Sequence, residues 1–293
     1  MAHKTIKHVV RSQKVDMGGI PILQPIPGRE IRQIDPFLLI HHWRQDFAGN
    51  VHPSKVGVGP HPHRGFSPVT FIYSGDIHHR DSEGNDAIVG SRGTQWMFAG
   101  SGLTHSERPS AEMARDGGTL ELIQFWVNAP AATKMNAPEY YPLQGDDTPQ
   151  AVSPDGKITF LVASGELLGV SGPIPVLSPL IAAQVYFEEG GEATLTMPAD
   201  QHTLLYVLDG QTEVNGTAVT ETELAWMPVG TGDTIHLRSL TAGKAMLLSG
   251  APLNEPVASY GPFVMNTSRE IMQALEDAQM GRMGELLETF DHA

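Results

Sequence analysis

The side chains best able to do chemistry in this sequence are histidines, and most of them lie in one part of the chain. Eight of the 13 histidines fall between positions 41 and 105, namely His41, His42, His52, His61, His63, His78, His79 and His105. The sequence contains no cysteine, so any metal site has to be built from imidazoles and carboxylates.

Two of these histidine segments have the spacing of metal ligands on β-strands. Residues two apart on a strand point to the same face with Cα atoms about 6.6 Å apart, so His61 and His63 can bind one ion at about 2.0–2.1 Å each. His105 and Glu107 repeat this spacing further along the chain. Three imidazoles and one carboxylate suit Fe(II), Mn, Ni, Cu or Zn and leave coordination positions open for a substrate oxygen or for dioxygen.

The remaining histidines of this region have simpler interpretations. A lone His-X-His pair is more often two surface histidines than a metal site. The second pair, His105 with Glu107, is what favours metal binding here. His78 and His79 follow Gly75 beside charged residues and are predicted to be exposed in a turn. One of His41 and His42 should face inward, either lining a pocket or making a hydrogen bond in the core.

The elements that would position these ligands are predicted to be short strands. Glycine and proline together make up 31 + 22 = 53 of the 293 residues, which favours many strands joined by tight turns. Strand-like apolar runs lie at residues 69–73, 120–127, 157–163, 183–187, 204–208 and 244–248. The sequence therefore predicts an all-β sandwich or barrel.

The strand pattern occurs twice. Residues 69–75 resemble residues 204–210, each run ending in glycine and leading to a polar turn, which predicts two β-domains in tandem. The predicted domains are residues 1–140, which would bind the metal, and residues 141–293. Counting back from Gly210 puts Thr196 and Pro198 where His61 and His63 stand, so the second barrel should lack ligands.

Two segments outside the strand pattern carry further predictions. The proline-rich residues 171–179 cannot form a central strand, so we place the crossover between domains near them. Thr267 and Glu270 form a capping box that predicts a short C-terminal helix ending at Gly281. A helix over residues 129–135 is only weakly indicated.

Charge narrows the classes of partner. Lys and Arg number 19 against 33 Asp and Glu, a formal net charge of −14 that opposes direct binding to nucleic acid or to an anionic membrane. Neither a signal peptide nor a run of 18 apolar residues is evident, and we expect a cytoplasmic protein.

Taken together, these motifs resemble the pirins, a family of bicupin proteins whose bacterial members include quercetin 2,3-dioxygenases. The matching segments are residues 35–39, 61–66 with 69–70, 81–85, 95–107, 125–128 with 134–135 and 138, 253–257 and 260–267. The resemblance implies two cupin barrels with one metal in the N-terminal barrel, held by His61, His63, His105 and Glu107, the same four residues that the spacing indicates. Ser67 stands where many relatives have Glu, and residues 91–93 replace the usual Pro-Gly turn.

The resemblance also implies an activity. A quercetinase opens the ring of quercetin or a related flavonol or enolic aromatic with O2 and releases carbon monoxide. One divalent transition metal would serve, with Fe(II) the first choice and Mn, Ni, Co, Cu or Zn as alternatives. Glu107 would act as the catalytic base, and aromatic residues around His61 and Trp96 would hold the flat substrate.

Two other functions fit the same sequence. Some pirins act through protein partners, so a non-enzymatic, metal-bound regulatory protein is the alternative function. A bicupin with a purely structural metal and no turnover is the third.

Overall fold

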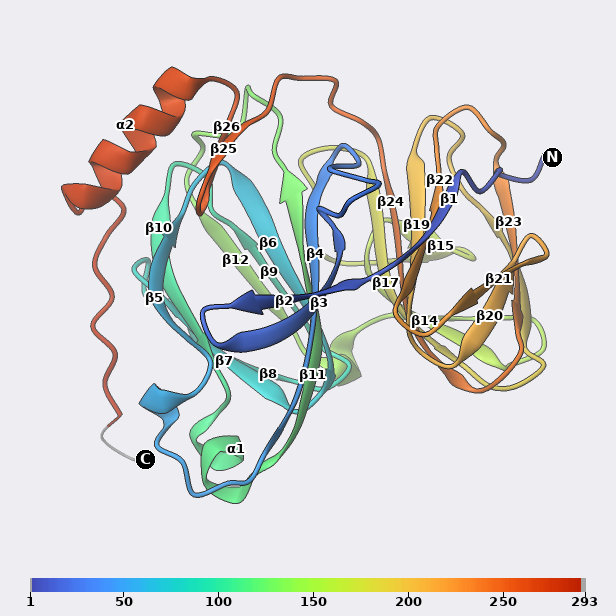
Figure 1. The fold of residues 1–293 in the computed structure, drawn as a ribbon, viewed down its shortest axis with the longest axis horizontal. Helices are drawn as coiled ribbons and strands as arrows, with labels where there is room; N and C mark the ends of the chain where they lie inside the picture. The colour runs from blue at the N-terminus through green and yellow to red at the C-terminus, as the bar shows by residue number, and fades with distance from the viewer. Residues whose placement is uncertain (1, 291–293) are drawn as a thin grey trace. The chain divides into compact units, whose positions relative to one another are not determined.

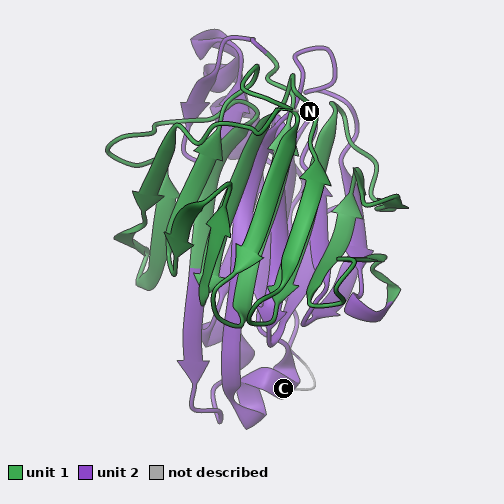
Figure 2. Ribbon diagram, turned by 90° about the vertical axis from the view of Figure 1, so that its right-hand side faces the viewer, with its two compact units in different colours: residues 1–42, 147–253 green, residues 43–146, 254–293 purple. Residues whose placement is uncertain are grey.

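The computed structural model describes residues 2–290 and divides the chain into two compact units (Figure 2). Unit 1 comprises residues 1–42 and 147–253, and unit 2 comprises residues 43–146 and 254–293. Each unit thus combines a middle segment of the chain with a terminal segment. The domains expected from the sequence, residues 1–140 and 141–293, are instead continuous. The proline-rich residues 171–179 lie inside unit 1, and the chain passes between the units at 42/43, 146/147 and 253/254.

Unit 2 contains the histidine-rich segment and is built from two antiparallel sheets. One has the order β12-β9-β6-β11 and the other the order β5-β10-β7-β8 (Figure 1). Their bounds are β5 (Val58–His63), β6 (Phe66–Ser74), β7 (Asp76–Asp81), β8 (Asp86–Gly90), β9 (Thr94–Phe98), β10 (Leu103–Arg108), β11 (Gly118–Asn128) and β12 (Glu139–Leu143). The C-terminal segment adds the hairpin β25 (Ala258–Tyr260) and β26 (Phe263–Met265) and then helix α2 (Ser268–Gln279).

Unit 1 is also built from two sheets, in the orders β1-β22-β19-β24-β17-β14-β13 and β18-β23-β20-β21. It further holds β2 (Gln13–Met17), β3 (Ile20–Ile26), the first half of β4 (Phe37–Phe47), and the small hairpin β15 (Glu166–Leu167) and β16 (Val170–Ser171). The sheet strands are β1 (His8–Arg11), β13 (Gln150–Val152), β14 (Ile158–Ser164), β17 (Leu180–Phe187), β18 (Glu192–Thr196), β19 (His202–Asp209), β20 (Gln211–Val214), β21 (Thr217–Thr220), β22 (Glu223–Met227), β23 (Thr234–Ser239) and β24 (Gly243–Gly250).

The strand order is the same in both units, as the sequence repeat predicts. The order β9-β6-β11 of unit 2 corresponds to β22-β19-β24 of unit 1, and β5-β10-β7-β8 corresponds to β18-β23-β20-β21. The repeated runs at residues 69–73 and 204–208 lie in the corresponding strands β6 and β19. The predicted all-β fold with two barrels is therefore confirmed.

The two interiors differ in polarity. The core of unit 1 is a single apolar cluster in which Leu195 of β18 lies opposite Ile235 of β23. Thr196 is exposed while Leu195 and Met197 are buried, so the inward positions are one residue away from those obtained by counting back from Gly210. The inward residues, Leu195 and Met197, offer neither an imidazole nor a carboxylate, in contrast to the histidines of β5.

The helices agree with the sequence at one position and differ at two. Helix α2 begins with the predicted capping box of Thr267 and Glu270, and Gly281 follows its end with φ +71°. Residues 129–135 form turns and no helix, because the hydrogen bonds to Pro130 O are not continued along the chain. Helix α1 (Ala111–Asp116), capped by Ser110, was not predicted.

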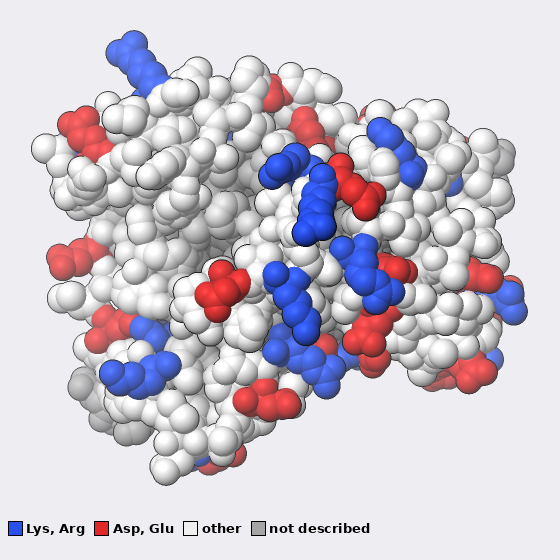
Figure 3. Space-filling model, viewed as in Figure 1, with Lys and Arg blue, Asp and Glu red and all other residues white. Residues whose placement is uncertain are grey.

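No helix within residues 2–290 is both long and apolar enough to cross a membrane. Acidic and basic side chains are interspersed on the face drawn in Figure 3, with no large field of a single sign.

Candidate metal centre

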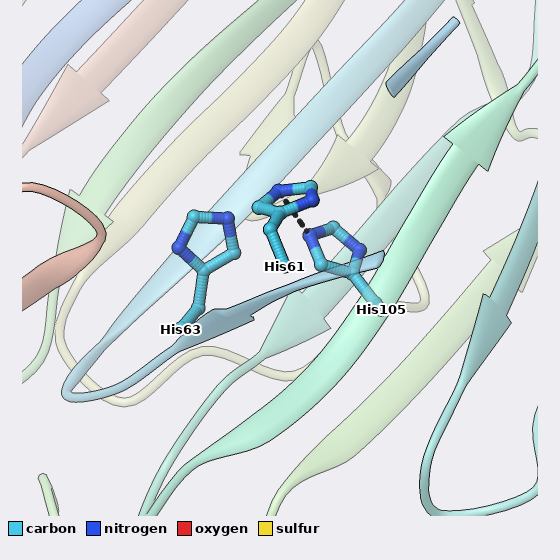
Figure 4. Close-up of side chains that lie close together, drawn as sticks. All are labelled: His61, His63 and His105. Carbon is cyan, nitrogen blue, oxygen red and sulfur yellow. Dashed lines mark hydrogen bonds between the residues drawn. The ribbon is translucent and has the colours of Figure 1, made fainter. Parts of the chain in front are cut away.

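Two neighbouring strands bring three histidines together. His61 and His63 lie on β5 and His105 lies opposite His61 on β10 (Figure 4). One nitrogen from each ring lies within 4.8 Å of the others, and the Nε2 atoms of His61 and His105 are 3.1 Å apart. Pro62 has no backbone N–H to donate, and this is tolerated because β5 is an edge strand with no neighbouring strand on its outer side.

The outer nitrogen of two of these rings faces a backbone carbonyl. His61 Nδ1 lies 2.8 Å from Gly59 O, and His63 Nδ1 lies 3.1 Å from Pro262 O. A carbonyl oxygen can only accept, so each Nδ1 must carry the proton and each Nε2 keeps its lone pair, which in His61 accepts from His105 Nε2 while no metal is bound. Both rings are therefore in the tautomer that a metal ligand needs.

Burial favours the neutral form of two of the three histidines. It is the main cause that lowers the pKa of His63 to about 3, and the nearby His61 lowers it further. The pKa of His105 also lies well below its usual value, first because of burial and then because of His61, His63 and His79. Neutral imidazoles with converging lone pairs fit a divalent transition metal.

Glu107 lies on β10 two residues beyond His105, as the spacing predicts, but its carboxylate does not belong to the group of three. It accepts hydrogen bonds from Gln124 Nε2 at 2.8 Å and from Thr70 Oγ1 at 3.3 Å. Thr70 and Gln124 lie on β6 and β11, so these bonds cross the barrel interior from one sheet to the other. The structure brings three of the four predicted ligands into one cluster and places the fourth on the same strand.

The prediction that His79 is exposed is wrong. Residues 76–81 form strand β7 instead of a turn. Along this strand Ile77, His79 and Asp81 are buried, whereas His78 and Arg80 between them are partly exposed. Asp81 lies opposite His105 on the neighbouring strand β10. The sequence signal that could have placed His79 inside is its position two residues after the apolar Ile77, since every second residue of a strand points to the same face.

The other histidine pair, His41 and His42, contributes no ligand to this group. His42 is buried, and its Nδ1 lies 3.1 Å from Tyr206 Oη in unit 1. His41 Nε2 lies 2.8 Å from Gln24 Oε1. The alternative of a hydrogen bond in the core therefore describes His42.

Aromatic rings stand beside His63. The Phe66 and Trp126 rings lie 5.1 Å and 5.5 Å from the His63 ring, centroid to centroid, and 4.3 Å from each other. Trp96, which was expected at the site, is buried and makes its ring contact with Phe125. The wall next to the histidines is thus formed by Trp126.

Two buried cations hold the turn between β5 and β6, and neither was predicted. Lys134 Nζ donates to Gly65 O at 2.7 Å, to Asn128 Oδ1 at 2.6 Å and to Val264 O at 3.2 Å. Arg64 donates to Ser101 O and forms an ion pair with Asp277 of α2 at 2.7 Å. The C-terminal segment therefore supports the strand that carries His61 and His63.

Two barrels of one strand order, one with an apolar interior and one with converging imidazoles, define a class of two-barrel β-protein in which, over residues 2–290, one barrel carries a group of side chains suited to a metal. Comparison with known proteins gives the family. The family model described as Pirin matches residues 20–127, and the model of the Pirin C-terminal cupin domain matches residues 182–284. The chain belongs to the pirin family.

Relatives of known sequence or structure cover nearly the whole chain. A pirin-like protein of Caulobacter vibrioides is 34% identical over 291 residues, which is 96% of this chain and 100% of that protein. The crystal structure of a quercetin 2,3-dioxygenase from Acinetobacter baumannii has 33% identity and a TM-score of 0.90, covering 98% of this chain and 100% of that one.

A more distant structure, a bacterial pirin of Escherichia coli in complex with nickel(II), has 16% identity and a TM-score of 0.65, covering 85% of this chain and 100% of that one. At that identity the similarity shows the fold alone.

Proposed function

We propose that this pirin is a metal-dependent dioxygenase that opens the ring of quercetin or of a related flavonol or enolic aromatic with O2. The observation that carries the proposal is the set of three imidazoles whose Nε2 atoms converge while two of their Nδ1 atoms donate to carbonyls. The similarity to the Acinetobacter baumannii quercetin 2,3-dioxygenase supports it.

His61, His63 and His105 would hold the metal, and Glu107 would complete the set as fourth ligand. A bound divalent cation supplies positive charge that lowers the pKa of a substrate hydroxyl and offers open coordination positions. Fe(II) is our first choice, and the same donors accept Mn, Ni, Co, Cu and Zn. Nickel(II) accompanies the Escherichia coli pirin.

Glu107 would also act as the general base. Its carboxylate would take the proton of the flavonol 3-hydroxyl, leaving an enolate that reacts with O2. Gln124 Nε2 and Thr70 Oγ1 donate to the two carboxylate oxygens, which orients the group within the barrel. No other carboxylate is assigned to this step.

Phe66 and Trp126 would hold the substrate. Trp126 is partly accessible, whereas Phe66 is buried behind it, and both rings lie beside His63. Flat aromatic ligands gain from offset or edge contacts with such rings. The substrate class is therefore aromatic and planar, with an enolic or phenolic oxygen.

The test is turnover of quercetin by protein loaded separately with each metal. Purified protein is stripped, loaded without oxygen with Fe(II), Mn, Ni, Co, Cu or Zn, and mixed with quercetin and O2. We expect loss of the visible absorbance of quercetin, O2 uptake and carbon monoxide release with at least one metal. The His63→Ala variant should lose both the bound metal and the turnover.

Protein that binds these metals but neither bleaches quercetin nor consumes O2 would contradict the enzymatic proposal. In that case, stoichiometric co-purification of a protein partner would support the regulatory alternative.

A further inference from the structure

The third histidine, His105, differs from the other two in what lies behind it. His61 and His63 each donate to a backbone carbonyl, which can only accept. His105 Nδ1 instead lies 3.5 Å from the Nδ1 of another imidazole, that of His79. An imidazole nitrogen can donate or accept, so His79 does not by itself determine which nitrogen of His105 carries the proton.

Asp81 determines which nitrogen of His79 carries the proton. The Oδ2 atom of Asp81 lies 3.0 Å from His79 Nε2 and accepts from Asn85 Nδ2 at 2.8 Å. Its Oδ1 atom accepts from the backbone N–H groups of Glu83 and Asn85, each at 3.0 Å. Because this carboxylate accepts at both oxygens, His79 Nε2 must carry a proton and His79 Nδ1 must be free to accept.

We propose that Asp81 and His79 are positioning residues that accept the Nδ1 proton of His105 when its Nε2 binds the metal. The proposal rests on the metal centre of the proposed function, though not on the dioxygenase reaction. It gives His105 the same proton arrangement that two carbonyls give His61 and His63.

The packing of His79 supports this role. His79 and Asp81 are both buried, and the His79 ring stacks on Tyr140 with centroids 3.9 Å apart and an interplanar angle of 9°. The stack fixes the plane of the His79 ring, so its Nδ1 stays directed along the line to His105. Ligand histidines oriented by a buried acceptor bind metal more tightly than free ones, typically by 10–100-fold.

The Asp81→Asn variant tests the proton arrangement directly. The two backbone N–H groups require an oxygen at the position of Oδ1, so the new NH2 group must stand at Oδ2 and donate to His79 Nε2. The proton of His79 moves to Nδ1, which faces His105. His105 then has no acceptor for the Nδ1 proton that it must carry when its Nε2 binds the metal.

The readouts are nickel(II) affinity by calorimetry and the imidazole tautomers in 15N NMR of the metal-free protein. In Asp81→Asn, we expect the dissociation constant for nickel(II) to rise about 10–100-fold and the His79 signal to change from the Nε2–H to the Nδ1–H tautomer. An unchanged affinity and an unchanged tautomer would overturn the proposal. Failure of the wild-type protein to bind nickel(II) would instead count against the proposed function.

Asp86→Asn is the matched control. Asp86 accepts from His78 at 2.6 Å, a second His–Asp pair of the same hairpin, which joins β7 to β8 and does not include a predicted ligand. This variant should bind nickel(II) as the wild type does. An equal loss in both variants would indicate a general effect on the hairpin and would overturn the proposal.

Two further measurements cover the case in which Asp81→Asn does not fold. The His79→Phe variant keeps a flat ring against Tyr140 but removes the acceptor, and it should show the same loss of nickel(II) affinity. In the wild-type protein, His79 should carry its proton on Nε2. A His79 proton on Nδ1 in the wild type would overturn the proposal without any variant.

Discussion

At the scale of single residues, the site depends on which nitrogen of each imidazole carries a proton. His61 and His63 both direct Nε2 toward the group of three histidines, because a carbonyl oxygen lies on the other side of each ring. In His63, burial also favours the neutral form, since a charged imidazole is poorly solvated there. Hydrogen bonding and desolvation therefore act in the same direction and prepare the rings for a cation.

The role of Glu107 is tested by Glu107→Gln. Glutamine has nearly the same shape but cannot take a proton, so we expect turnover of quercetin to fall by about 10²–10⁴-fold. The three histidines should still retain some metal. O2 uptake measured alongside metal content distinguishes the two effects, and full activity in the variant would exclude Glu107 as the base.

Stability should depend on pH through His63. Its pKa is lowered to about 3 in the folded protein, chiefly by burial, while an unfolded histidine titrates near 6.5. Between these values the unfolded chain binds a proton that the folded chain does not. The free energy of unfolding of the metal-free protein should therefore be unaffected by His63 above pH 6.5 and fall below it by up to about 1.4 kcal/mol per pH unit.

Urea unfolding in the presence of a chelator, at several pH values from 7 to 4, measures this dependence. Because other groups titrate in the same range, the comparison is between the wild type and His63→Gln. The variant should show the shallower slope, and equal slopes would refute the assignment.

At the scale of elements, the turn between β5 and β6 is the part of unit 2 that the C-terminal segment supports. Gly65 has φ +87°, and a Cβ atom there would lie 2.1 Å from Val264 O of β26. Lys134 joins the same two segments through Gly65 O and Val264 O. Because His63 donates to Pro262 O just before β26, the hairpin reaches the metal centre directly.

Replacing Lys134 with methionine should destabilise the protein by about 3 kcal/mol, because three buried oxygens lose their shared donor. Metal affinity should fall as well, since the turn after His63 is no longer held. Denaturant unfolding and nickel(II) calorimetry measure the two effects. The exposed Lys157, replaced in the same way, should change stability by less than about 0.5 kcal/mol, and an equally small change at Lys134 would contradict this account.

At the scale of the whole molecule, one strand order supports two different interiors. In unit 1 the strands that correspond to β5 and β10 carry Leu195 and Ile235, which pack in an apolar core. In unit 2 the same strands carry imidazoles. The suitability of one barrel for a metal therefore depends on its side chains and not on the barrel architecture itself.

This difference predicts the metal content. In the part of the chain that the structure describes, His61, His63 and His105 form the group suited to a metal, so freshly purified protein should contain about one transition-metal ion per chain. Elemental analysis measures this, and His63→Ala should bring the content close to zero. A content of two ions per chain would show that unit 1 also holds a site.

The amino-acid sequence alone determined the features that depend on neighbouring residues. The His-X-His and His-X-Glu spacings, the strand runs, the repeat at residues 69–75 and 204–210, and the capping box of α2 all follow from local periodicity and turn chemistry. These features were sufficient to predict the all-β fold and the three clustered histidines.

The tertiary structure decided what depends on residues far apart in the sequence. The carbonyl behind His63 comes from Pro262, about 200 positions away, and Trp126 instead of Trp96 stands beside that ring. His79 was predicted to be exposed because charged neighbours suggest a turn, yet strand pairing with β10 buries it behind His105. Spacing predicts which side chains share a face, but only packing between distant strands determines what stands behind each ring and therefore which nitrogen is free to bind a metal.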